Sequence, residues 1–312
     1  MLRRSRRGRL PVALCIDAEQ DDREVDRADP AWRGLESLFE RLPATRRRLE
    51  HLTRAPASLS WFVRADPQVE LGNGSAGWAL TNYAPAWESL LADGDDVGIH
   101  CHAWRWDEPG GEWIADHGDP GWVEHCVDLG LTAYGERFGT PPPCYRGGDR
   151  FLSDAIVARL EAEGVGVDAT LEPGMPATDG LVDSERGTGS IPDYTTVPRT
   201  VYRPSATDFR RPDPDREPGL RMLPLTPGGG ETLYPWTDPE AFRDRLRDRL
   251  ADRDLTHLAF AIRTDLALYD NAWEVLLENM EAVARLAGRR RIEFVTATEA
   301  AARAPASEPA SA

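Results

Sequence analysis

The chain has 312 residues, of which 41% are hydrophobic and 29% are charged. This length allows one barrel-sized domain or two ordinary domains, with enough apolar residues for a sizeable core. Acidic residues outnumber basic ones by 53 to 37, and the net charge of −16 disfavours nucleic acid or an anionic membrane as a partner. A neutral or cationic small ligand fits this composition better.

The cysteines and the chain ends point to a cytoplasmic protein. The cysteines lie far apart and form no C-x-x-C pair, so the sequence suggests neither a disulfide framework nor a cysteine-rich zinc site. They are Cys15, Cys101, Cys126 and Cys144. The arginines of residues 1–9 imitate a signal peptide, but acidic residues interrupt the apolar run that follows and no cleavage site is present. We expect an Arg-rich leader at 1–9, no membrane span, and a disordered tail at 304–312.

Short apolar runs alternate with amphipathic stretches, which is typical of repeated β-α units. Strands are predicted at 10–16, 58–63, 96–102, 143–146, 166–170, 220–225, 257–263 and 291–296. Helices are predicted at 35–53, 84–92, 122–138, 154–163, 239–252 and 272–287. Ser153 is a candidate N-cap of the fourth helix, and Gly164 is its expected stop. The alternation predicts a single α/β domain over residues 10–303.

Residues 173–230 interrupt this rhythm with many Pro and Gly residues. Loops of this length are uncommon inside compact domains and are usually functional or disordered. We expect an irregular excursion over one face of the barrel, with a β-hairpin around residues 195–202.

Two histidines of the predicted strand at 96–102 form a candidate metal pair. The two-residue period of a strand places His100 and His102 on one face, where both imidazoles can reach one ion. The same period places Cys101 on the opposite face, so Cys101, like Cys15, is expected to be a small buried hydrophobe. The alternative is two unrelated histidines, one packed and one exposed.

Two carboxylates at the end of the first predicted strand share a face in the same way. Strand ends of a barrel point into its mouth, so Asp17 and Glu19 can meet the two histidines there. Two histidines and one carboxylate leave open positions on a divalent ion, and the other carboxylate is then free to act as general base. The alternative is an acidic stretch that begins a solvent loop, since Asp21 and Asp22 follow.

These segments together resemble the NodB-type polysaccharide deacetylases, in a branch with Asp-x-Glu and His-x-His-x-Trp patterns. The resemblance covers most of the chain in motif order and implies a distorted (β/α)7 barrel with one divalent ion, zinc first and nickel, cobalt or manganese as alternatives. The segments that carry it are 14–19 (LCIDAE), 59–63 (LSWFV), 96–104 (DVGIHCHAW), 145–151 (YRGGDRF), 166–174 (GVDATLEPG) and 294–296 (FVT).

The resemblance implies roles for several residues. Glu19, His100 and His102 would hold the metal, Asp17 would be the base, and Arg146 would orient Asp17 by a bidentate contact. The chain departs from the family at Trp104, where the second metal histidine usually stands, and at Arg263, where the general acid histidine usually stands. An arginine can stabilise an oxyanion but cannot give up a proton near neutral pH.

Four further residues are candidates for the barrel mouth, and Asp265, Trp104 and Trp106 among them are candidate substrate-binding residues. Asp168 is expected to pair with Arg263 or Arg146, or to be an ordinary loop residue, and Asp265 is expected to point into the mouth. Trp104 and Trp106 suit stacking on a sugar ring, although tryptophan is also a common core residue.

We therefore expect a metal-dependent hydrolase that removes an N- or O-acyl group from a sugar or sugar-containing precursor. The competing hypotheses are a catalytically inactive carbohydrate-binding protein on the same barrel and a hydrolase of small non-sugar amides. The sequence leaves the oligomeric state open.

Overall fold

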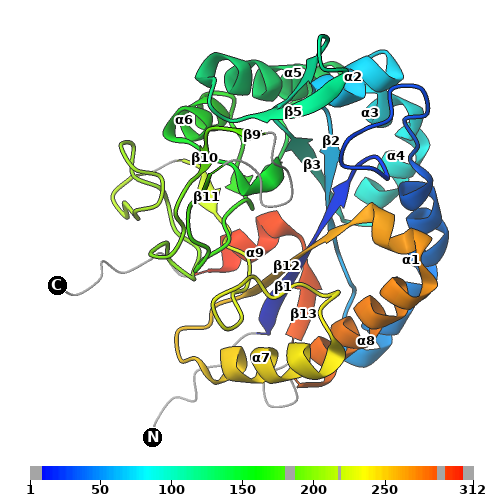
Figure 1. Cartoon of the computed structure of the whole chain (residues 1–312). Coiled ribbons are helices and arrows are strands. Elements are labelled where there is room, and N and C mark those ends of the chain that lie inside the picture. Colours follow the sequence, from blue (N-terminus) through cyan, green and yellow to red (C-terminus); the bar gives the residue numbers. More distant parts are fainter. Residues whose placement is uncertain (1–8, 180–186, 217–218, 287–291, 305–312) are drawn as a thin grey trace, which may run out of the picture.

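The centre of the molecule is a curled sheet of parallel strands. The computed structural model describes residues 9–179, 187–216, 219–286 and 292–304, so most of the expected leader and tail lies outside the described residues. The strands follow the order β11-β7-β6-β3-β2-β1-β12 (Figure 1). They are β1 (Leu10–Ala18), β2 (Ser60–Arg64), β3 (Asp96–Cys101), β6 (Cys144–Gly147), β7 (Val167–Asp168), β11 (Arg221–Met222) and β12 (Leu258–Arg263). An eighth strand, β13 (Ile292–Val295), pairs with β1 off this path. The path of seven strands is the distorted (β/α)7 barrel that the resemblance implied.

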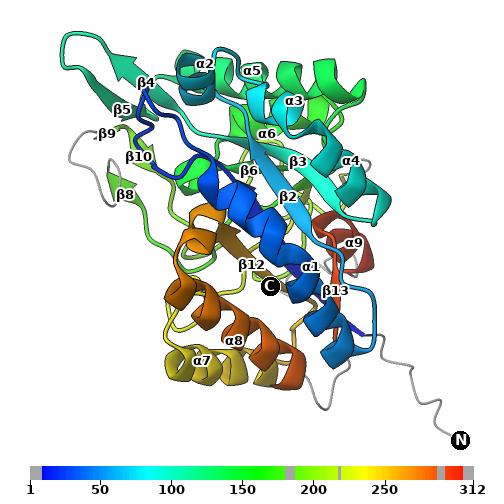
Figure 2. The ribbon, with the colours of Figure 1, turned by 90° about the vertical axis from the view of Figure 1, so that its right-hand side faces the viewer.

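Helices surround the outside of this sheet (Figure 1). All six predicted helices are present, as α1 (Arg33–Thr53), α4 (Ala84–Ala92), α5 (Pro120–Phe138), α6 (Asp154–Ala162), α7 (Pro239–Ala251) and α8 (Asp270–Leu286). Ser153 caps α6 by accepting a hydrogen bond from the Ile156 amide, and Gly164 follows the helix with φ +82°. Figure 2 shows α1, α8 and α7 side by side over one flank. None of the helices in the described ranges is long and apolar enough to cross a membrane.

Side chains alternate between the inside and the outside of the barrel along each strand. Small side chains gather on the inside, among them Ala13, Cys15, Ala259 and Ala261. Larger ones pack outward against the helices, among them Leu14, Ile16, Phe260 and Ile262. The same period directs Asp17, His100 and Arg263 to the inside, close to the carboxyl ends of their strands.

Two devices close the barrel. The chain after β11 bridges the gap to β12, because the Thr226 amide donates to the Ala259 carbonyl at 2.8 Å and the Ala259 amide donates to Thr226 Oγ1 at 2.9 Å. Helix α9 (Ala297–Arg303) follows β13 (Ile292–Val295) and packs its alanines into the inner cluster. It contacts Ser60 and Arg221, which begin β2 and β11, so α9 lies at the amino end of the barrel. The open end is therefore the carboxyl end.

The structure differs from the expected elements in several places. The expected hairpin at 195–202 is wrong: Tyr202 instead forms an isolated antiparallel bridge with Met222. A hairpin lies elsewhere, between β4 (Trp104–Asp107) and β5 (Glu112–Asp116), with Gly111 in its turn at φ +65°. Two short helices, α2 (Pro67–Asn73) and α3 (Trp78–Asn82), were not predicted. Residues 173–230 are mostly irregular where described, with only β8 (Thr178–Asp179), β9 (Gly187–Thr188), β10 (Ser190–Ile191) and β11.

Gly98 allows β3 and β6 to approach closely. A Cβ at this position would lie 2.3 Å from the Cys144 carbonyl oxygen of the neighbouring strand. We predict that Gly98→Ala lowers the free energy of unfolding by about 1–3 kcal/mol, because backbone atoms cannot yield as a flexible side chain can. Urea unfolding measures this change. The matched control is Gly135→Ala in α5, where a Cβ would meet nothing within 4 Å; equal effects of the two substitutions would contradict the prediction.

Candidate active site and metal centre

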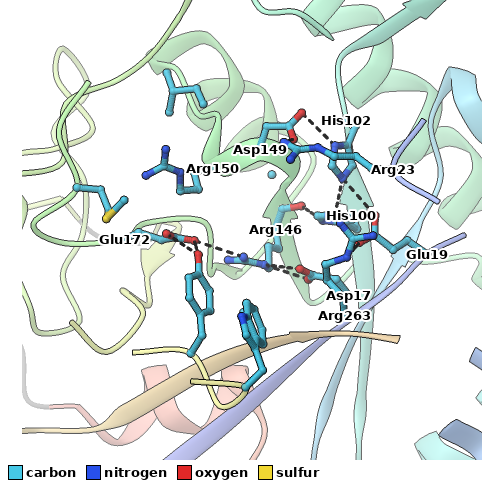
Figure 3. A pocket seen from close by; sticks show the side chains of 16 residues that line it. Asp17, Glu19, Arg23, His100, His102, Arg146, Asp149, Arg150, Glu172 and Arg263 are labelled. Atoms are coloured by element: carbon cyan, nitrogen blue, oxygen red, sulfur yellow. Dashed lines mark hydrogen bonds and ion pairs between the residues drawn. The ribbon is translucent and has the colours of Figure 1, made fainter. Parts of the chain in front are cut away.

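A cavity of about 350 Å³ lies at the carboxyl ends of the barrel strands (Figure 3). Its walls combine charged residues of β1, β3, β6 and β12 with residues from the loops that follow them. The lining residues are Asp17, Glu19, Arg23, His100, His102, Arg146, Gly147, Asp149, Arg150, Glu172, Met175, Ile191, Tyr234, Trp236, Ala261 and Arg263. The cavity thus brings together six of the predicted site residues.

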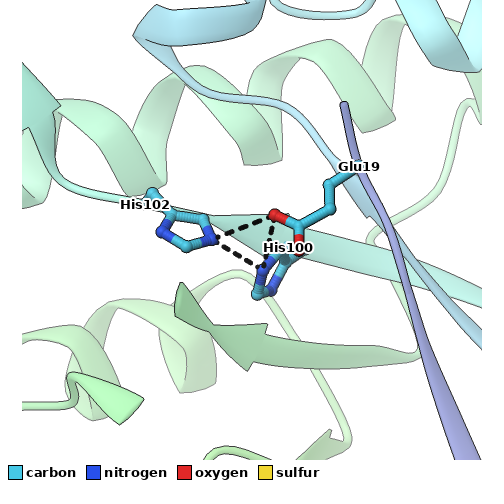
Figure 4. A group of neighbouring side chains, drawn as sticks. All are labelled: Glu19, His100 and His102. Atoms are coloured by element: carbon cyan, nitrogen blue, oxygen red, sulfur yellow. Dashed lines mark hydrogen bonds and ion pairs between the residues drawn. The ribbon is translucent and has the colours of Figure 1, made fainter. Parts of the chain in front are cut away.

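Glu19, His100 and His102 form a compact set of metal-ligating atoms (Figure 4). The Nε2 atoms of the two histidines are 2.9 Å apart. Glu19 Oε2 lies 3.4 Å from His102 Nε2 and 3.9 Å from His100 Nε2. All three side chains are buried.

The other ring nitrogen of each histidine is held by a hydrogen-bond acceptor. His100 Nδ1 donates to the Arg146 carbonyl at 2.8 Å, and His102 Nδ1 donates to Asp149 Oδ2 at 3.1 Å. These bonds leave the Nε2 atoms facing each other and a carboxylate, an arrangement that a cation bound between them would stabilise. Two imidazoles and one carboxylate form a typical donor set for a divalent ion with open positions, so the residues fit a metal.

Charged neighbours fix the protonation states of these ligands. Burial alone would raise the pKa of Glu19, but Arg263, His102 and Arg64 outweigh it and hold that pKa well below its usual range. Burial lowers the pKa of His100. For His102, burial and Arg64 lower the pKa, yet Asp149 and Glu19 raise it further, so the net shift is upward. A proton therefore competes with a metal for His102.

Asp17 lines the same cavity as the candidate metal ligands but is held by a different partner. Both of its carboxylate oxygens accept from Arg146 Nε, at 3.0 and 3.1 Å. Arg146 Nη1 donates to the Ala169 carbonyl at 2.7 Å, and its Nη2 lies 3.7 Å from Glu172. This contact places Arg146 against the candidate base, as the resemblance implied. Glu19, rather than Asp17, approaches the histidines.

Arg263 occupies the position on β12 where the resemblance implied a proton donor. Its Nε lies 3.1 Å from Glu19 Oε1 and 3.2 Å from Asp265 Oδ1. Asp265 does not line the cavity, contrary to the expectation, and forms an ion pair with Arg263 instead. Glu19 and Asp265 keep this guanidinium charged, since they raise its pKa.

Asp168 is placed differently from the expectation. Its neighbours Val167 and Ala169 pack in the inner cluster, so strand alternation turns Asp168 away from the cavity. Its carboxylate accepts from the amide and hydroxyl of Thr170, at 2.9 and 2.8 Å, and pairs with neither Arg146 nor Arg263 among the described residues. Burial raises the pKa of Asp168 to about 6. Asp168 is therefore a buried residue that holds the backbone and side chain of Thr170 in place, away from the cavity.

The tryptophans after the histidines do not line the cavity, contrary to the expected sugar-stacking position. Trp104 is buried and donates to Asp149 Oδ2 at 2.9 Å, whereas Trp106 packs on Trp113. The aromatic wall consists of Tyr234 and Trp236, whose rings stack at 4.2 Å. Neither residue was singled out by the sequence, because both follow the irregular stretch.

Asp149 is a further site residue that sequence reasoning missed. Its carboxylate accepts from His102 and Trp104, contacts Arg23, and lies 3.7 Å from His117 Nε2. Asp149 and the following Arg150 both adopt positive φ, at 53° and 62°. This left-handed pair is unusual outside glycine and places both side chains at the cavity.

The remaining histidines and cysteines lie outside the site or serve packing. His117 is buried and stacks on Phe151 at 4.5 Å, while His125 is exposed on α5. All four cysteines are free and buried, as expected for Cys15 and Cys101. Burial raises the pKa of Cys15 to about 12, so that thiol stays neutral.

Comparison with family models and with curated sequences gives no match. A provisionally assigned polysaccharide deacetylase from Mycobacterium smegmatis is 14% identical, with a TM-score of 0.57 over 98% of this chain and 96% of that chain. A provisionally assigned glycoside hydrolase/deacetylase from Parabacteroides distasonis is also 14% identical, with a TM-score of 0.59 over 95% of this chain and 71% of that chain. This chain has the polysaccharide deacetylase fold.

The fold is also found in Puue allantoinase, which is 12% identical with a TM-score of 0.53 over 95% of this chain and 90% of that chain. The side-chain chemistry of this chain follows from its own residues, in particular from two histidines separated by one residue, His100 on β3 and His102 directly after it.

We predict that His100→Ala and His102→Ala each abolish tight metal binding, because each removes one of three ligand atoms that lie within 4.8 Å of one another. Elemental analysis after dialysis measures the bound metal. The exposed His125 provides the control, and His125→Ala should keep the wild-type metal content. Full metal retention in both site variants would disprove the assignment.

We predict that Asp168→Asn stabilises the deacetylase fold above about pH 6. Burial disfavours the carboxylate, so the folded wild-type chain loses stability as the pH rises from about 4 to about 6, whereas Asn does not titrate. A shift of this size corresponds to at most about 3 kcal/mol. Thermal unfolding between pH 4 and pH 8 measures the difference in Tm between Asp168→Asn and wild type. This difference should grow in favour of the variant up to about pH 6 and then level off. The exposed Asp93→Asn should show no such trend; a loss of stability in Asp168→Asn at pH 8 would contradict the prediction.

Proposed function

We propose that this chain is a metal-dependent hydrolase that removes an N- or O-acyl group from a sugar or a sugar-containing precursor. One observation carries the proposal: the Glu19–His100–His102 ligand set and the Asp17–Arg146 pair line the same cavity. The deacetylase fold supports it. A soluble precursor suits the cytoplasmic location that we predict from the sequence.

Glu19 and the two histidines would hold the metal, with zinc as the first candidate and nickel, cobalt or manganese as alternatives. A divalent ion at this position supplies a water of lowered pKa and polarises an acyl carbonyl. The protein supplies the orientation of its ligands through Arg146, Asp149 and Arg263, each of which holds one ligand side chain.

Asp17 is the candidate general base. It stands two residues before Glu19 on the same face of the chain, and the Arg146 Nε contact to both oxygens fixes its orientation. Asp17 can therefore accept a proton from a water positioned in front of the metal ligands. Glu19 serves as the ligand and Asp17 as the base in this proposal.

Arg263 would stabilise negative charge on the acyl oxygen but cannot protonate a leaving group. An amine must be protonated before it leaves, whereas an alcohol depends less on an acid. The absence of an acid at this position therefore favours ester cleavage over amide cleavage. It also favours the alternative of a binding protein that retains the cavity without turnover.

The test is acyl release from a panel that contains 4-nitrophenyl acetate, acetylated sugars and small amides. We predict that Asp17→Asn keeps the metal and loses about 10²–10⁴-fold in kcat, because it removes the base and no ligand. Glu19→Gln should lose the metal, and the exposed Asp22→Asn should behave as wild type.

Each other outcome has a defined meaning. Metal loss in Asp17→Asn together with retention in Glu19→Gln would exchange the two carboxylate roles. A metal-loaded wild-type chain that releases no acyl group from any compound would favour the binding protein.

A further inference from the structure

Arg150 is a cation of the cavity that the proposed chemistry does not use. Figure 3 shows its guanidinium on the side of the cavity away from Glu19 and Arg263. It is carried on the left-handed pair described above, where φ of Arg150 is 62°. An arginine in this conformation is uncommon, and such outliers cluster at binding sites.

The other arginines of the cavity wall each contact a carboxylate of this chain. Arg23 contacts Asp149, Arg146 contacts Asp17, and Arg263 contacts Glu19. Within the described residues Arg150 has no ion pair: Nη2 donates to Thr178 Oγ1 at 3.5 Å, and Nη1 is buried without a hydrogen-bond partner. This holds in a chain with 53 acidic and 37 basic residues, where carboxylates are in excess.

A buried guanidinium N–H without an acceptor is unfavourable, and arginine cannot relieve it by losing a proton. An oxyanion from a ligand would supply the missing acceptor. The planar fork of a guanidinium matches a carboxylate or a phosphate group in a bidentate contact.

We infer that Arg150 binds an oxyanion of the ligand, a carboxylate or a phosphate ester. In the proposed function, on which this step rests, the acyl group lies at Glu19 and the histidines and the acidic group lies at Arg150. Tyr234, Trp236, Met175 and Ile191 line the same cavity and provide apolar contacts for the rest of the molecule. A volume of about 350 Å³ suits a small acylated sugar that carries such an acidic group.

The test is calorimetric titration of the full chain with acetate and with inorganic phosphate, after dialysis against a chelator and in parallel after loading with zinc. In the chelated sample no metal ion is present that could itself bind acetate or phosphate. We expect saturable binding to wild type and a Kd raised at least about tenfold in Arg150→Met, with partial retention in Arg150→Lys. Binding of acetate alone identifies a carboxylate, and binding of phosphate alone a phosphate ester.

Arg159→Met provides the matched control, because Arg159 lies on α6 outside the cavity and pairs with Asp128 and Glu163. It should keep the wild-type Kd, and circular dichroism should show that all three variants are folded. Equal Kd values for wild type and Arg150→Met would overturn the inference, as would the absence of saturable binding of either ion to wild type. Because the chelated sample contains no metal, the outcome is independent of whether the hydrolase proposal holds.

Discussion

The register of the parallel strands is the constraint on which the site depends. Asp17 of β1 lies opposite Arg263 of β12, and His100 of β3 lies between Arg64 of β2 and Arg146 of β6. These pairings place one carboxylate, one imidazole and three guanidinium groups at neighbouring strand ends of the barrel. A slip of one residue in any strand would turn its functional side chain outward into the helical layer.

The cavity wall is a balanced set of buried charges. Four carboxylates and four guanidiniums line it, and most are joined in specific pairs. Such pairing is necessary because an isolated buried charge carries a large desolvation cost. Glu172 shows the same principle with neutral partners, since it accepts from Thr232 at 2.7 Å and from Tyr234 at 2.8 Å. The side chains are thereby held in place before any ligand arrives.

The sequence predicted the parts of the molecule that follow from local periodicity. Alternation along the first and third predicted strands brought Asp17 and Glu19 together with His100 and His102, and in the structure Glu19 approaches the two histidines. The contact of Arg146 with Asp17 was implied by the resemblance and by no local pattern. Alternation applied to Val167 and Ala169 would also have turned Asp168 outward, so that signal was present but outweighed by the resemblance.

Other features depend on contacts that no local pattern encodes. Asp149 meets its partners through a left-handed backbone, and Arg23 lies 126 residues away from it in the chain. The chain bends after His102 into β4, which takes Trp104 out of the period that the histidines follow. Tyr234 and Trp236 reach the cavity from an irregular segment, where neither helical nor strand spacing applies.

Helix α9 gives the barrel one closed end. Its alanines pack into the inner cluster and contact β1 and β7, so α9 covers the amino end of the barrel in the described chain, while the cavity lies at the carboxyl ends of the strands. Whatever enters and whatever leaves must share that carboxyl end. For a hydrolase this geometry means that departing and arriving molecules exclude each other, and each product that still occupies the cavity acts as a competitive inhibitor of the next turnover.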